Sequence, residues 1–306
     1  MNRDEQSFYS NGKLLLTGEY VVLDGAKALA LPTKFGQSLK VVPSEGNAIK
    51  WVAFDCDQTV WLDEMIEFSE ISSFSGLATV PRERLIRLLH EAWKISPVFL
   101  EKKGWNIETQ LTFPRHWGLG SSSTLINNLA QWLNIDPYEL LRRGFGGSGY
   151  DIGCAQNSSP IKYTLRENQP TVELSSFDPK FADKLYFVYL NRKQSSREAI
   201  DNYRSRQPQE IDAAITGISQ LTDKIESLTD FAEFCSTLKL HEQTIAKLID
   251  QPTIQEQLFA DFTGTIKSLG AWGGDFILAA ADGDPSDYFY NRGYNVVIRY
   301  DKIILK

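Results

Sequence analysis

The chain has 306 residues, of which 42% are hydrophobic and 23% charged, and its formal net charge at pH 7 is −7. This length allows one large domain or two lobes. The acidic balance argues against nucleic acid or an anionic membrane as the main partner. No apolar run approaches the roughly 20 residues that span a bilayer, and the first residues lack the apolar core of a signal peptide. Because the three cysteines are isolated, we expect reduced thiols in a cytoplasmic protein.

The first half of the chain is predicted to be rich in strands. Apolar and β-branched residues in period-two patterns indicate antiparallel strands, and apolar residues on one helical face after Pro81 indicate a helix. In chain order we expect a strand and turn over 13–23, strands over 38–44, 48–55 and 58–64, a helix over 82–96, a strand over 105–113, and a helix from the glycines at 118–120 to about 134.

The second half mixes strands with a long helical region. Asp136 and Pro137 are typical of a helix start, and breaks near Pro208, Thr229–Asp230 and Pro252 divide the helical pattern. We expect a short helix over 136–143, a glycine-dense loop over 144–153, strands over 159–165, 171–177 and 184–191, helices from 195 to about 269, and closing strands over 275–281 and 294–306. These elements predict an α+β protein of two interleaved lobes with a boundary near residue 170.

The segment HWGLGSSST, residues 116–124, precedes the second predicted helix and has two interpretations. Glycines let backbone N–H groups approach a ligand closely, and a helix N-terminus favours an anion such as a triphosphate. Serine hydroxyls there can bind phosphate or complete the ligand shell of Mg²⁺. The alternative is that Ser121 or Ser122 only caps the helix. The segment is not the usual P-loop, since the Gly-x-x-x-x-Gly-Lys-Ser/Thr pattern is absent.

Three further segments contain candidate functional residues. In GGSGYDIG, Asp151 is a candidate for orienting an attacking hydroxyl or taking its proton, or it caps a helix that begins at Ile152. Lys13 lies in a predicted strand and is a candidate phosphate contact, with Glu19 as a partner for it or for a buried backbone group. The late glycines of SLGAWGGDFILAA indicate a tight turn or a close approach of the backbone to a ligand.

Taken in order, these segments resemble the motifs of the GHMP kinase superfamily, which includes galactokinase, homoserine kinase, mevalonate kinase and phosphomevalonate kinase. The first motif is similar to GKLLLTGEYVVLDGAKALALPT, the phosphate loop to PRHWGLGSSS and the third motif to GAWGGDFILA. The segment GSGYDIGCAQNSSPIKYT looks most like that of phosphomevalonate kinases. The resemblance covers residues 10–282, with Asn11 in place of the usual proline and Trp272 within the last glycine run.

The resemblance implies a two-lobed fold with ATP and Mg²⁺ as cofactors. The N-terminal lobe, residues 1–170, would be of the ribosomal-S5-like type, and the C-terminal lobe, 171–306, ferredoxin-like. Asp151 and Lys13 would be the catalytic residues. The implied ATP-phosphate contacts are Gly118, Leu119, Gly120, Ser121, Ser122 and Ser123. The implied metal ligands are Ser122 and Glu139.

An anionic small-molecule acceptor, phosphomevalonate or mevalonate, follows from the same resemblance, in a monomer or homodimer. Its implied contacts are Lys13, Glu19, Ser148, Asp151, Lys193, Ser195, Ser196, Arg197, Gly273 and Gly274, and Ser195 or Ser196 could instead cap a helix. His116 and Trp117 stand where relatives have small residues, and Trp117 is expected to fill the core. The alternatives are a decarboxylase of diphosphomevalonate, a non-catalytic nucleotide or metabolite sensor, and a serine hydrolase with His116 as base.

Overall fold

A computed structural model of the chain describes residues 5–101, 103–192, 201, 203–270, 272 and 274–306. The chain divides into two compact units, each discontinuous in sequence, because strands β1 (Gln6–Leu15) and β2 (Ala28–Ser44) each run through both. Unit 1 consists of residues 1–12, 35–115 and 119–156, and unit 2 consists of residues 13–34, 116–118 and 157–306. The α+β class is confirmed, whereas the lobe boundary near residue 170 stays a prediction.

The sheet of unit 1 has the strand order β4-β3-β5-β2. Strand β3 (Ala48–Phe54) pairs antiparallel with β4 (Val60–Glu67) and parallel with β5 (Gly104–Leu111), and β5 pairs antiparallel with β2. Alternate residues of β3 are buried, as the period-two pattern predicts. One face of the sheet is therefore apolar and contributes to a core with the helices of this unit.

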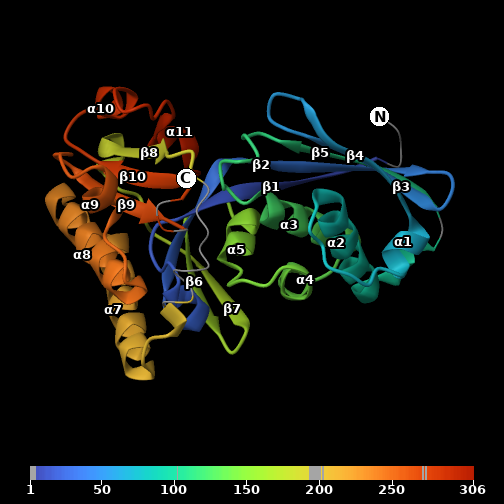
Figure 1. Cartoon of the computed structure of the whole chain (residues 1–306), viewed down its shortest axis with the longest axis horizontal. Helices are drawn as coiled ribbons and strands as arrows, with labels where there is room; N and C mark the ends of the chain where they lie inside the picture. Colours follow the sequence, from blue (N-terminus) through green and yellow to red (C-terminus); the bar gives the residue numbers. More distant parts are fainter. Residues whose placement is uncertain (1–4, 102, 193–200, 202, 271, 273) are drawn as a thin grey trace. The chain divides into compact units, whose positions relative to one another are not determined.

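The helices of unit 1 supply the other side of its core. They are α1 (Phe68–Ser72), α2 (Pro81–Ile95), α3 (Ser121–Leu133), α4 (Pro137–Gly144) and α5 (Tyr150–Gln156), with a 3-10 turn η2 (Pro97–Leu100). Helix α3 packs against α2, α4 and α5, and Figure 1 shows α3 beside α5. The helices predicted over 82–96, to about 134 and over 136–143 are confirmed. Residues 150–153 were expected in the glycine-dense loop but belong to α5, so this loop ends earlier.

Unit 2 contains two groups of strands. The first part of β2 pairs with β6 (Ile161–Arg166), which pairs with β7 (Gln169–Leu174). A separate antiparallel sheet has the order β11-β8-β10-β9, and its bounds are β8 (Leu185–Tyr189), β9 (Thr265–Leu269), β10 (Phe276–Ala280) and β11 (Val297–Arg299). Every residue of β8 and β10 is buried, because both strands lie inside this sheet.

The remaining elements of unit 2 are helices and short turns. Helix α7 (Pro208–Ser227) packs against α8 (Phe231–Ile249), and α8 packs against β9 (Figure 1). The others are α9 (Ile254–Leu258), α10 (Ser286–Tyr290), α11 (Tyr300–Ile303) and the 3-10 turns η1 (Val21–Asp24) and η3 (Ala182–Lys184). Among the helices in the described ranges, none is long and apolar enough to cross a membrane.

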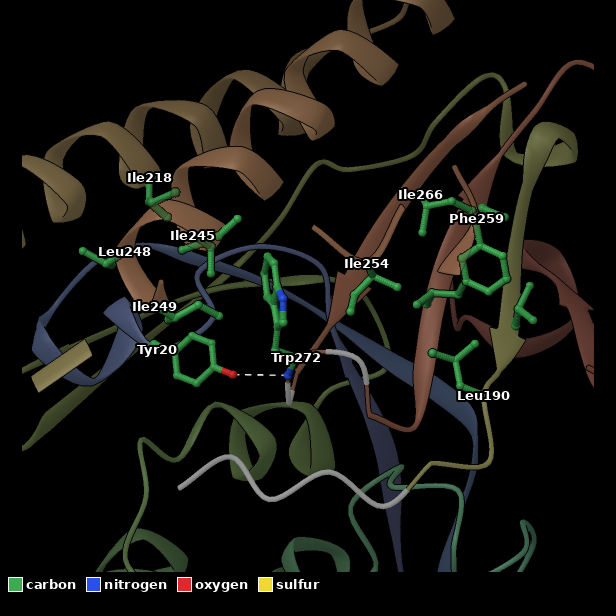
Figure 2. Close-up of a cluster of buried hydrophobic side chains, with 14 of the residues drawn as sticks. Tyr20, Leu190, Ile218, Ile245, Leu248, Ile249, Ile254, Phe259, Ile266 and Trp272 are labelled. Atoms are coloured by element: carbon green, nitrogen blue, oxygen red, sulfur yellow. Dashed lines mark hydrogen bonds between the residues drawn. The ribbon is translucent and has the colours of Figure 1, made fainter. Parts of the chain in front are cut away.

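Trp272 fills the core of unit 2 rather than a ligand-facing loop. It is buried among the aliphatic side chains of α7, α8 and α9 (Figure 2). Its backbone N–H donates to the Tyr20 hydroxyl at 3.2 Å, and its indole N–H donates to the Pro252 carbonyl at 3.0 Å. Trp272 itself is therefore anchored to the core.

Three further sequence predictions of secondary structure are wrong. The strand predicted over 13–23 ends at Leu15, because Gly18 and Tyr20 have φ of +94° and +64° and turn the chain into η1. Residues 265–269 form β9 although a helix was expected there. The C-terminal run is a short strand followed by helix α11, since Tyr300 and Ile303 bury one helical face.

Candidate functional site

The glycine loop, residues 118–120, leads directly into helix α3 of unit 1. Gly120 is the N-cap of this helix with φ of +95°, and no side chain caps it, so neither Ser121 nor Ser122 has the alternative capping role. A left-handed N-cap favours glycine. The first N–H groups of a helix have no intrahelical acceptor and carry the positive end of its dipole. The start of α3 therefore has the chemistry that an anion such as a phosphate requires.

The serines of this loop differ in orientation. Ser122 is exposed, whereas Ser123 is buried and its hydroxyl donates to the Gly120 carbonyl at 2.9 Å. Thr124 donates to the same carbonyl at 3.0 Å, and Leu119 is fully buried. Ser123 and Leu119 thus stabilise the loop, and Ser122 offers a hydroxyl to solvent. The phosphate contacts assigned to these residues stay a prediction.

Asp151 lies in the first turn of α5, the helix that packs against α3. It is half-buried, and its Oδ1 accepts from the N–H of Ile152 at 3.1 Å. The helix begins one residue before Asp151, and the N–H of Ile152 also donates to the Gly149 carbonyl at 3.0 Å. Ser148 is half-buried in the turn before this helix. Unit 1 therefore brings the carboxylate of Asp151 and the glycine loop onto two helices in contact.

Tyr138 on α4 is a polar residue near Asp151 that the sequence interpretation did not include. Burial raises the pKa of its hydroxyl, and the negative charge of Asp151 raises that pKa further. The hydroxyl oxygen is buried, and no partner for it occurs within the described residues. A buried hydroxyl without a partner is unfavourable by about 1–3 kcal/mol. The sequence pattern around it, DPYELL, indicates only a capped helix.

Glu139, the other predicted metal ligand, is on the same helix. Its carboxylate accepts from Arg143 at 2.7 Å and 3.0 Å, one helical turn later. Both side chains are partly exposed, so the pair contributes little to stability. Within the ranges that the structure describes, no group of three or more His, Cys, Asp or Glu side chains is placed to hold a metal ion. The two metal ligands assigned from the sequence stay a prediction.

Unit 2 contains the third candidate residue, Lys13, near the end of β1. Its ammonium group donates to the Gly118 carbonyl at 2.7 Å, and Gly118 has φ of +66°. Asp275 approaches Gly118 from another side and is half-buried. These groups border a pocket in this unit that is lined by Lys13, Leu14, Leu15, Trp117, Gly118, Leu269, Gly270, Asp275 and Phe276.

His116 and Trp117 contact an aromatic group of unit 2. Their rings lie 5.7 Å and 6.0 Å from the ring of Tyr189, and Trp117 meets Phe276 edge-on at 5.6 Å. The Tyr189 hydroxyl donates to the His116 carbonyl at 3.1 Å. These contacts fix the entrance of the glycine loop by aromatic packing. Trp117 was expected to fill the core. It is half-buried and lines the pocket of Lys13, so it packs at the edge of the core.

Glu19 is fully buried in unit 2 and belongs to a cluster of charged residues. Its carboxylate forms an ion pair with Lys267, and Lys267 Nζ lies 3.3 Å from Glu242 Oε2. His241 Nε2 accepts from the N–H of Gly18 at 3.1 Å and lies 3.7 Å from Glu19 Oε2. We refer to Glu19, His241, Glu242 and Lys267 as the buried charge cluster. The carboxylate of Glu19 is buried against Lys267. A role of Glu19 in acceptor binding stays a prediction.

Burial dominates the ionisation of this cluster. It raises the pKa of Glu19 to about 7, against the lowering effect of Lys267, and raises the pKa of Glu242. The pKa of His241 is well below its usual value, because burial and the charge of Lys267 both disfavour the imidazolium. His241 is therefore neutral, which agrees with its Nε2 accepting a hydrogen bond. Two carboxyl groups thus share one ammonium group.

The remaining predicted acceptor contacts are only partly described. Lys193, Ser195, Ser196, Arg197 and Gly273 lie outside the described residues. Gly274 is buried and precedes Asp275. Only Gly274 of this group therefore has a known place, in the turn before β10.

Several solved structures with the same fold are kinases of small molecules. The mevalonate kinase of Methanococcus jannaschii aligns over 100% of both chains with a TM-score of 0.73 and 13% identity. The L. major mevalonate kinase in complex with R-mevalonate aligns over 98% of this chain and 96% of its own, with a TM-score of 0.66 and 15% identity. The Streptococcus pneumoniae phosphomevalonate kinase in complex with phosphomevalonate and AMPPNP aligns over 98% of both chains, with a TM-score of 0.65 and 14% identity.

Sequence comparison alone does not find this relationship. No protein-family profile matches the chain, and no curated protein matches it. The galactokinase of Lactococcus lactis and a heptose 1-phosphate kinase are also similar in structure, at 14% and 16% identity. The resemblance seen in the three motifs is thus confirmed at the level of fold, and the chain has the fold of the GHMP kinases.

Proposed function

We propose that the chain is an ATP- and Mg²⁺-dependent kinase of a small anionic alcohol. The main support is the packing of helix α5 against helix α3. Helix α5 carries Asp151, and helix α3 begins at the end of the glycine loop. A phosphate site and a carboxylate that can receive a proton are the two parts that phosphoryl transfer to a hydroxyl requires. The similar structure with bound AMPPNP supports a nucleotide at this site.

The residues of the chain have separate tasks in this reaction. The N–H groups at the start of α3 would bind the phosphates of ATP, and Ser122 and Glu139 would hold Mg²⁺. A Mg²⁺ ion held there would supply neutralisation of the charge on the transferred phosphoryl group. Asp151 would orient the acceptor hydroxyl and take its proton. At the same time the hydroxyl oxygen would bond to the γ-phosphorus, and the bond from that phosphorus to the leaving ADP would break. Lys13 would bind the acceptor as a fixed positive charge.

The preferred acceptor is mevalonate or phosphomevalonate. Support comes from the similar structures, which include kinases of both compounds, and from the segment around Asp151 described above. The first experiment measures ADP release with mevalonate, phosphomevalonate, homoserine and galactose. We expect stimulation by one of the two isoprenoid acids. If neither compound stimulates ADP release, the proposed acceptor class is wrong. Stimulation by homoserine or galactose would still support the proposed kinase activity.

The Asp151→Ala variant tests the catalytic assignment. We expect kcat to fall by at least about 10²–10⁴-fold, as for loss of a general base, while the Kd for ATP, measured by calorimetry, stays within threefold. Asp212→Ala is the matched control, since Asp212 is exposed on α7 in the other unit, and it should keep full activity. Turnover above a tenth of the wild-type rate in Asp151→Ala would exclude this mechanism.

A further inference from the structure

Asp275 is a half-buried carboxylate of unit 2 to which the motifs assign no role. It directly precedes Phe276, the first residue of β10. Its backbone carbonyl accepts from the N–H of Leu190 at 2.8 Å, which ties it to the end of β8. Since both strands are buried, the position of Asp275 is fixed by the core. Its side chain therefore reaches Gly118 from the start of a buried strand.

The carboxylate lies directly against Gly118. A Cβ atom added to Gly118 would stand 1.7 Å from Asp275 Oδ2 and 2.3 Å from its Cγ. The space that a side chain at position 118 would need is thus filled by Asp275. The carbonyl of the same Gly118 accepts from Lys13 Nζ at 2.7 Å. An ammonium group and a carboxylate therefore meet the same residue of the loop.

The charges around Asp275 are of opposite sign to its own. Burial raises the pKa of Asp275, and the positive charges of Lys13, first, and His116, second, act against this rise. Burial, and then the negative charge of Asp275, raise the pKa of the Tyr189 phenol. A carboxylate that loses part of its hydration is stabilised by a nearby ammonium group. Lys13 is the main such group for Asp275.

We propose that Asp275 is a positioning residue, which holds the Lys13 ammonium group at the Gly118 carbonyl and so sets the place where Lys13 meets the acceptor. The inference rests on the proposed kinase function, in which Lys13 binds the acceptor. Asp275 acts through Lys13, because its own negative charge repels an anionic acceptor. The flexible four-carbon stem of lysine gives many orientations of its ammonium group, and a fixed carboxylate selects one of them.

Steady-state kinetics of Asp275→Asn test this role, because asparagine keeps the size and removes the charge. We expect the acceptor KM to rise about tenfold while the ATP KM stays within twofold. A lower acceptor KM would show that Asp275 acts only by repelling the acceptor. An equal rise in the acceptor KM and the ATP KM would indicate a structural role. Either result overturns the inference. Asp282→Asn is the matched control, since Asp282 is exposed after the other end of β10 and pairs with Lys184, and both KM values should be unchanged.

The pH profile gives a second kinetic readout. Protonation of Asp275 removes the charge that holds Lys13, so acceptor kcat/KM should fall on the acid side in the wild type. Because burial raises the pKa of Asp275, this fall begins at a higher pH than for an ordinary aspartate. In Asp275→Asn the contribution of Asp275 should be absent, so the acid limb should begin at lower pH and contain only the contribution of other groups such as the base Asp151. An identical acid limb in the variant would contradict the role of the Asp275 charge.

A measurement that needs no turnover separates the inference from the proposed function. The carboxyl signal of Asp275 is followed by ¹³C NMR against pH and assigned by its loss in Asp275→Asn. In Lys13→Met the titration midpoint should move to higher pH, since a neighbouring positive charge is lost, while Lys184→Met should leave it unchanged. An unmoved midpoint in Lys13→Met overturns the inference even in an active kinase. A moved midpoint in a protein without kinase activity rejects only the proposed function.

Discussion

Gly118 has charged groups of its own unit on two sides, with Lys13 at its carbonyl and the Asp275 carboxylate where a side chain would be. Its φ of +66° belongs to the left-handed region, which costs other residues about 1–2 kcal/mol. Two independent constraints therefore require glycine at this position. The glycine itself is evident in the sequence as part of a possible phosphate loop. Its contact with Asp275 is not, because the two residues are far apart along the chain.

Gly118→Ala should destabilise the protein by at least about 2 kcal/mol, because the backbone strain adds to the contact with Asp275. The double variant Gly118→Ala with Asp275→Gly removes that contact and should recover part of the loss, while the φ strain remains. Urea unfolding of the single and double variants measures both effects. Gly217→Ala is the control, since Gly217 lies within α7 with open space around it, and helix propensity predicts a gain of about 0.5–1 kcal/mol. A double variant no more stable than Gly118→Ala would contradict the steric argument.

At the scale of elements, local sequence signals predicted helix α2 of unit 1 correctly and missed strand β9 of unit 2. Helix α2 begins at a proline and has its apolar residues on one face, so local signals are sufficient to define it. Strand β9 was expected to be helical. It contains Lys267, a residue type that is almost never fully buried without a partner. Its partners, Glu19 and Glu242, come from distant parts of the chain, so no local pattern indicates a buried strand.

The buried charge cluster joins the turn before η1, α8 and β9 through Lys267, and removal of Lys267 should therefore be costly. Lys267→Met leaves two buried carboxyl groups without their cation, and we expect a loss of about 3–5 kcal/mol in the free energy of unfolding. Lys224→Met, in the exposed pair with Glu233 at 2.8 Å, is the matched control and should cost at most about 1 kcal/mol. Equal losses in the two variants, measured by urea unfolding, would show that the cluster is not a strong link between these elements.

For the molecule as a whole, three short motifs in the right order indicated a fold that structural comparison found at 13–15% identity. Such motifs are visible because backbone geometry at glycines and helix starts restricts the residue types there. Two interleaved lobes were predicted, but the positions at which the chain passes from one unit to the other were not. Strands β1 and β2 each pass through both units, and pattern analysis of separate elements does not reveal where along a strand its contacts change.

The buried charge cluster also makes the stability of the whole protein depend on pH. The pKa of Glu19 rises from the model-compound value of 4.5 to about 7 on folding, so the folded state binds a proton that the unfolded state releases. The contribution of Glu19 is therefore fully present below about pH 4.5 and is lost as the pH rises through about 7. The loss between these limits is on the order of 3 kcal/mol.

Urea unfolding at pH 5, 6, 7 and 8 tests this dependence, with a wild-type free energy of unfolding that declines over the series. In Glu19→Gln the decline should be much smaller, because glutamine leaves Glu242 as the single carboxylate beside Lys267, and the variant should be at least as stable as wild type at pH 8. Glu83→Gln is the control. Hydrogen bonds from Thr79 lower the pKa of Glu83. Titration of Glu83 therefore changes the free energy of unfolding only below about pH 4.5. If the free energy of unfolding of Glu19→Gln declines as much as that of the wild type, the proton that the folded state retains is bound by another group.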